Sequence, residues 1–88
     1  MTTFAITSDK KSDALNNMLK QLYGEENTLI IDDHLRIVLS DKDITAEDVF
    51  KKLNESKEEY GKFVIFSINS YFGYHTKSIW DWLKAKGV

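Results

Sequence analysis

The sequence predicts an α+β domain whose elements follow one another as strand, helix, strand, strand, helix, strand. Apolar residues alternate in short β-rich segments, as expected for strands, and recur every three to four residues in the segments between them, as expected for amphipathic helices. Turn or capping residues stand at the junctions. With 88 residues the chain has room for one core, so we expect a single domain over residues 1–88.

The first strand and helix are predicted from the N-terminal residues. Residues Thr3–Ser8 alternate and are rich in β-formers, which indicates a strand that runs directly into Asp9. Ser12 is a suitable N-cap for a following helix, and Gly24 is a suitable stop. The apolar stripe of this helix is Ala14, Leu15, Met18, Leu19 and Leu22.

The middle of the chain predicts a hairpin. A short apolar strand, Thr28–Ile31, is separated by Asp32 and Asp33 from a second strand, Leu35–Leu39. Two strands joined by a short polar turn are best explained as a hairpin. An acid–histidine site at Asp32, Asp33 and His34 is the alternative, and the turn explains these residues better.

A second helix, a strand and a third helix complete the pattern. Thr45 to Asp48 resembles a capping box, and we expect the helix to end at Gly61. Residues Phe63–Ile68 form the most hydrophobic run, which favours a strand buried on both faces, at least in part. Thr76 can cap the last helix, whose large side chains are Ile79, Trp80, Trp82 and Leu83.

Two β-α-β units around a hairpin give the ferredoxin-like βαββαβ sandwich. Right-handed crossovers place both helices on one face of a four-stranded antiparallel sheet. The other face needs an apolar cover, because Phe63–Ile68 and the aromatic residues after it are too apolar for solvent. We expect the C-terminal helix, a second copy of the chain, or both to cover it.

Composition narrows the function classes. The chain has no cysteine, which excludes disulfides and thiolate metal sites. No signal-peptide pattern or apolar segment of bilayer length is present, so the cytoplasm is expected. The net charge of −2 gives no bulk basic footprint for nucleic acids. His34 and His75 lack a third ligand at zinc spacing.

Aromatic residues near the C-terminus are the clearest candidates for a binding surface. They could stack bases, as in RNA-recognition modules, or pack in a core or a protein interface. The low basic charge favours packing. Trp82 is predicted to point away from the face shared by Trp80 and Leu83, and so to mark an interface. The candidate interface residues are Phe66, Tyr71, Phe72, Tyr74 and Trp82.

Cations near the first helix and on the hairpin are candidates for phosphate contacts. Lys10, Lys11 and Arg36 are the residues in question, and a solvated charged face is the alternative because acidic residues are interspersed with them.

The segment Met1–Asp9, a strand ending in Asp, resembles the opening of the CRISPR-associated protein two superfamily, in particular its stand-alone SinR-like members. The closing segment Ile79–Leu83, with two tryptophans, is also similar to the SinR-like group. The resemblance implies a ferredoxin-like fold and a homodimer, and in some members a metal-dependent endonuclease. Asp9 is the residue that carries over, as catalytic residue and metal ligand.

Two functions therefore stay open. The first is a homodimeric nucleic-acid-associated protein, if catalytic a Mg²⁺-dependent endoribonuclease in which two copies of Asp9 share one ion. The second is a non-catalytic protein-interaction module, such as an antitoxin, an adaptor or a phage-encoded inhibitor. Asp9 as an ordinary polar residue at a strand end is the simpler interpretation of that position.

Overall fold

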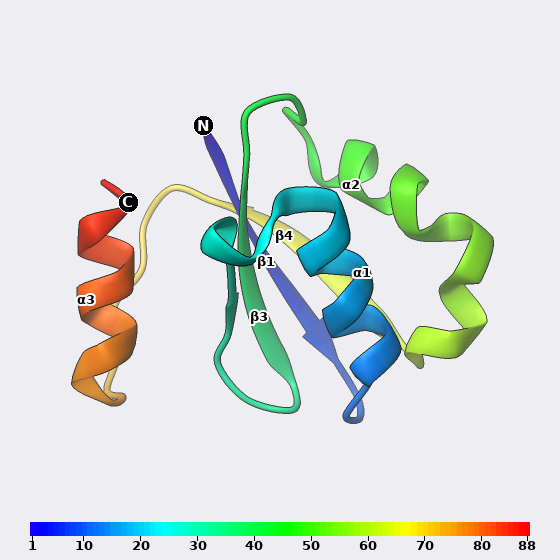
Figure 1. Cartoon of the computed structure of the whole chain (residues 1–88), viewed down its shortest axis with the longest axis horizontal. Helices are drawn as coiled ribbons and strands as arrows, with labels where there is room; N and C mark the ends of the chain where they lie inside the picture. Colours follow the sequence, from blue (N-terminus) through cyan, green and yellow to red (C-terminus); the bar gives the residue numbers. More distant parts are fainter.

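A computed structural model describes residues 1–88 and confirms the α+β prediction. Four strands form one antiparallel sheet in the order β2-β3-β1-β4, which is the ferredoxin-like order. Figure 1 shows α1 and α2 on one side of the sheet and α3 on the other. In chain order the elements are β1 (Thr2–Ser8), α1 (Asp13–Tyr23), η1 (Glu25–Asn27), β2 (Thr28–Ile30), β3 (Leu35–Ser40), α2 (Ala46–Leu53), η2 (Asn54–Tyr60), β4 (Phe63–Ile68) and α3 (Lys77–Ala85).

Local signals in the sequence set most of the element ends. The Ser12 side chain accepts the N–H of Leu15 at the start of α1, and Thr45 and Asp48 form a reciprocal capping box at the start of α2. Gly24 ends α1 at a φ of 88° that other residues rarely adopt. Two expectations were wrong in detail. Helix α2 ends at Leu53 and continues as the 3₁₀ segment η2, and Thr76 stands at the N-cap of α3 without a side-chain capping bond.

The β2–β3 connection is a turn, as expected. The Asp32 carboxylate accepts the backbone N–H of His34 at 2.7 Å, which closes the turn through a side chain. The His34 ring contacts the carbonyl oxygen of Ser8 at 3.1 Å. Asp32 and His34 therefore serve the hairpin, and no group of three His, Asp or Glu residues gathers there or elsewhere in the chain.

The main core lies between the sheet and the α1–α2 layer. Alternate residues of β1 and β3 meet the apolar stripes of both helices, and nothing in this cluster reaches solvent to a significant extent. Its members are Phe4, Ile6, Leu15, Leu19, Tyr23, Val38, Val49, Leu53 and Tyr60.

The second face of the sheet is covered by α3, one of the two covers that the sequence predicts. Ile79 and Leu83 of α3 pack on Ile37 of β3, with Leu29 and Ile68 beside them. This smaller cluster lies over the β2–β3 half of the sheet and leaves much of β4 open. Every hydrogen bond of residues 69–88 stays within that segment, so α3 is held to the sheet by side-chain packing alone.

The expectation that β4 is buried on both faces was wrong. β4 is an edge strand, and α3 packs over the β2–β3 half of the sheet, so no helix covers the second face of β4 at Val64 and Phe66. Phe63 and Ile65 are half-buried toward α2, whereas Val64 and Phe66 are 53% and 52% exposed on the opposite face. None of the helices combines the length and apolar character that a membrane-crossing segment requires.

Candidate functional site

Asp9 closes the end of the β1–β4 ladder. Its backbone N–H donates to the carbonyl oxygen of Lys62 at 3.0 Å, and its Oδ1 accepts the backbone N–H of Lys62 at 3.0 Å. Gly61 lies close by, where an added Cβ would come 2.8 Å from Asp9 Oδ1. The carboxylate thus substitutes for the next backbone carbonyl of the ladder, which is a structural use of the residue.

The residues around Asp9 do not make a metal site within one chain. Mg²⁺ is commonly held by one or two carboxylates together with waters and substrate oxygens. Asp9 brings one carboxylate, one of whose oxygens already accepts from Lys62, and no metal-competent group of three ligands is present in the chain. A shared ion would require a second carboxylate from another copy.

The predicted phosphate contacts are not equivalent. Lys10 and Lys11 are exposed in the loop that leads into α1. Arg36 is 0% exposed, because β3 is central in the sheet and α1 covers its side chain. The placement of Arg36 therefore contradicts its role as a phosphate contact.

Arg36 instead joins three parts of the fold from inside. Its Nε donates to Asn16 Oδ1 at 2.6 Å, and its Nη1 donates to Ser8 Oγ at 2.7 Å. Its Nη2 donates to the carbonyl oxygen of Asp33 at 2.9 Å. Burial lowers the pKa of the Arg36 guanidinium below its ordinary value, and the nearby charges of Asp32 and Asp33 partly oppose this shift.

A second buried polar cluster surrounds Asp43, a residue that the sequence did not single out. Asp43 Oδ2 accepts from Tyr23 Oη at 3.0 Å, from Ser40 Oγ at 2.9 Å and from Lys52 Nζ at 2.9 Å. The three donors come from α1, β3 and α2, so one carboxylate oxygen ties the helix layer to the end of a central strand. The Lys52 ammonium also lies 5.5 Å from the centre of the Tyr23 ring.

The electrostatics of this cluster favour structure over catalysis. Burial alone would raise the pKa of Asp43, but hydrogen bonds from Lys52, Ser40 and Tyr23 outweigh it and hold that pKa below its usual range. Burial and the neighbouring Asp43 raise the pKa of Tyr23. Proton transfer near neutral pH needs groups with pKa values close to that pH. The pKa of Asp43 and the pKa of Tyr23 are both shifted further from neutral pH.

The aromatic residues after β4 form an exposed surface beside α3. We define the aromatic surface as Tyr71, Phe72, Tyr74 and Trp80. Phe72 and Tyr74 are fully exposed, whereas Tyr71 stacks parallel to Trp80 with the ring centres 6.2 Å apart. Tyr71 Oη donates to the carbonyl oxygen of Val88 at 2.7 Å, which fixes the ring against the end of the chain.

A hollow of about 490 Å³ opens in this surface. Rings from the connection and from α3 line it, and one cation stands at its rim. The lining residues are Tyr71, Phe72, Gly73, Trp80, Lys84 and Val88. A hollow of this size, lined mainly by aromatic and apolar groups with one charged side chain, is typical of a ligand-binding site.

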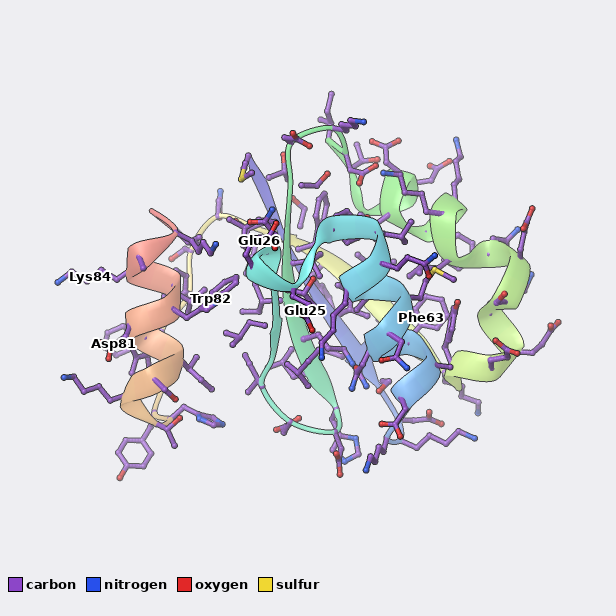
Figure 2. The ribbon with its side chains drawn as sticks, in the orientation of Figure 1. Glu25, Glu26, Phe63, Asp81, Trp82 and Lys84 are labelled. Atoms are coloured by element: carbon purple, nitrogen blue, oxygen red, sulfur yellow. The ribbon has the colours of Figure 1, made fainter.

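Two predicted interface residues lie apart from this surface. In Figure 2, Trp82 projects from α3 toward the sheet, while Asp81 and Lys84 lie on the other side of the helix. Trp82 packs, partly buried, against the Ile37 cluster within its own chain, so the expectation that it points away from the face of Leu83 was wrong. Phe66 is exposed on β4 and belongs to a separate apolar patch with Val64.

No protein-family model, curated protein or solved structure matches the chain. The resemblance to the CRISPR-associated protein two superfamily and to SinR-like proteins accordingly stays a prediction from the sequence pattern.

Proposed function

We propose that this chain is a non-catalytic protein-interaction module, and that it binds its partner through the aromatic surface. The observation that carries the proposal is the pair of fully exposed rings, Phe72 and Tyr74, beside a preformed apolar hollow. Large exposed aromatic groups around a pocket are typical of binding hot spots, because burying them supplies most of the free energy of association.

The charges on α3 define the chemistry of the partner. Lys77 and Lys84 lie on this helix, whose single carboxylate is Asp81, while Lys86 lies over the Trp82 ring. Lys84 is also at the rim of the hollow. The partner is therefore a protein that projects an apolar side chain into the hollow and carries acidic residues around it.

Single-stranded RNA is the second candidate ligand. The stacked rings of Tyr71 and Trp80 with Lys84 nearby are the features that favour it, since bases stack on aromatic rings and cations bind phosphates. Lys10 and Lys11 would not add to this surface, because they lead into α1 on the opposite face of the sheet. Protein binding fits better, since the remaining cations of the surface are few.

The variant Phe72→Ala/Tyr74→Ala tests the proposal. Ile44→Ala is the matched control, because Ile44 is also a highly exposed apolar residue but lies on the β3–α2 connection. A partner captured by the native chain is identified and purified, and its affinity is measured by calorimetry. We expect the double variant to bind at least about 30-fold more weakly, as two lost hot-spot rings imply, and the control to bind normally.

The same three proteins are titrated with a fluorescent single-stranded RNA at two salt concentrations. Salt-dependent RNA binding that requires Phe72 and Tyr74 would favour the second candidate over a protein partner. Unchanged binding of a partner protein by the double variant would contradict the proposed surface.

An endoribonuclease that uses Mg²⁺ at Asp9 is tested separately. The native chain and Asp9→Ala are incubated with structured RNA and Mg²⁺. Cleavage that Asp9→Ala abolishes would contradict a non-catalytic module, whereas equal residual cleavage by both would remove Asp9 from any mechanism.

A further inference from the structure

The outer edge of β4 carries unpaired backbone groups. In the ladder with β1, Asp9 faces Lys62 and donates its N–H to the Lys62 carbonyl oxygen. Backbone groups of an antiparallel strand point alternately toward one neighbour and the other. The register therefore directs the N–H and C=O groups of Val64, Phe66 and Ile68 to β1, and it directs outward those of Phe63, Ile65 and Ser67.

Nothing in the chain protects this edge. Residues Phe63–Ile68 contain no charge and no proline, and their pairing with β1 has no bulge. Edge strands of monomeric proteins usually carry such features, or are very short, because a bare edge pairs with other strands. The other edge strand, β2, has only three residues. A hollow of about 310 Å³ lies between α2 and β4, so the helix leaves the edge accessible.

We propose that β4 pairs antiparallel with β4 of a second copy, around a twofold axis at Ile65. Phe63 then faces the partner's Ser67, and Ile65 faces the partner's Ile65. Each facing pair of outward residues exchanges two backbone hydrogen bonds, which gives about six bonds over the three pairs. The two sheets become one continuous sheet with the α1–α2 layers on the same side.

The side chains of β4 are complementary to themselves in this register. On the face away from α2, Val64 lies opposite the partner's Phe66, so the two half-exposed side chains of the strand cover each other. Cross-strand pairs of aromatic and β-branched residues stabilise sheets. On the other face the large Phe63 lies opposite the small Ser67 of the partner subunit. Lys62 lies opposite the partner's Ile68, so no like charges meet.

The inference goes beyond the proposed function, since it concerns a different surface. It also bears on Asp9. Asp9 faces Lys62, which lies three residues from the axis. The two Asp9 residues of the dimer are therefore about 20 Å apart along the strands, and three strand spacings put them about 14 Å apart across the sheet. A separation of about 25 Å prevents them from sharing one ion. The same dimer would present two aromatic surfaces to a partner.

Sedimentation equilibrium of the native chain and of Val64→Lys/Phe66→Lys tests the pairing. In the variant, lysines face lysines across the axis, and both positions are half exposed, so the fold is retained and is checked by circular dichroism. Ile44→Lys is the matched control. Strand pairing alone buries less than the ~1,200 Å² of a tight complex, so we expect the dimer to have a micromolar Kd. The Kd of the double variant should be at least about tenfold higher. The control should dimerise normally.

A cysteine probe tests the register. The chain has no cysteine of its own, so Ile65→Cys introduces one thiol on the proposed axis, where facing Cα atoms about 5.5 Å apart permit a disulfide. Under mild oxidation Ile65→Cys should cross-link and Ile44→Cys should not. A native chain that stays monomeric up to about 300 µM, where a micromolar dimer would form, would overturn the proposal. So would a dimer unaffected by the double lysine variant. Neither result would bear on partner binding by Phe72 and Tyr74.

Discussion

Replacing Asp43 by Asn should destabilise the fold more than any other isosteric change of a carboxylate in this chain. The change removes the charge but keeps the size of the side chain. Asp43 Oδ2 accepts from Tyr23, Ser40 and Lys52 at 2.9 to 3.0 Å. An amide group at this place keeps one neutral acceptor and turns the other side of the group into a donor.

The expected loss follows from the three bonds. Hydrogen bonds to a charged group contribute roughly 1.5–3 kcal/mol, and bonds to a neutral group about 1 kcal/mol, so Tyr23 and Ser40 together lose about 2 kcal/mol. Lys52 is partly exposed, and solvent screening limits its share to about 0.5 kcal/mol. The total of about 2–3 kcal/mol corresponds to a Tm lower by roughly 10–20 °C in a domain of this size.

The assay is urea unfolding followed by circular dichroism between pH 7 and pH 3. Because the folded pKa of Asp43 is depressed, its contribution to stability is present above its unfolded pKa of about 3.9 and is lost as the pH falls through the lower folded value. The gap between the native chain and Asp43→Asn should therefore be constant from pH 7 to about pH 5 and shrink below about pH 4.

Asp41→Asn is the matched control, since Asp41 is an exposed carboxylate on the same connection. Asp41→Asn should change the free energy of unfolding by no more than about 0.5 kcal/mol. Tyr23→Phe, alone and combined with Asp43→Asn, measures the coupling between the two residues. The reasoning fails if Asp43→Asn equals the native chain in stability at pH 7, or if the gap between them persists unchanged at pH 3.

Two further predictions concern residues that the structure moves into structural roles. Arg36→Ala should lower the free energy of unfolding by about 3 kcal/mol, because it leaves buried acceptors unpaired. Lys11→Ala, the control, should change that free energy by less than about 0.5 kcal/mol. Equal effects of the two variants in urea unfolding would contradict the burial of Arg36. Gly61→Ala should lower the free energy of unfolding more than Gly87→Ala does. Both glycines have a φ of 74°, but only at Gly61 would the new Cβ meet another group, Asp9 Oδ1. Asp9→Ala should relieve part of that cost, and additive effects in the double variant would refute the contact.

The fold was predictable because its signals are local. Alternation, capping residues at Ser12 and Thr45, and the handedness of crossovers are enough to give the strand order and the layer of α1 and α2. The exposure of one face of β4 was not predictable from its composition, since an apolar run does not reveal what covers each face of the strand. That depends on where α3 docks, which is over Ile37 and Leu29 of the β2–β3 half.

The candidate site was less predictable, because its groups come together through tertiary contacts. Asp43 acquires its partners from three elements that are far apart in the sequence. Arg36 is buried because α1 covers it on a strand that is central in the sheet, and a hairpin pattern alone leaves that residue equally suited to solvent. The aromatic residues after β4 were identified as a group, but which ring of α3 turns to the sheet depends on how the helix docks.

The way in which α3 is attached has a consequence for the dynamics of the chain. With no hydrogen bond between residues 69–88 and the rest, only the small cluster around Ile37 opposes detachment of this segment. Local opening should then cost less free energy than global unfolding, and the amides of α3 should exchange with deuterium faster than those of β1 and β3. A ligand on the aromatic surface would slow that exchange, so protection of α3 would report binding before any partner structure is known.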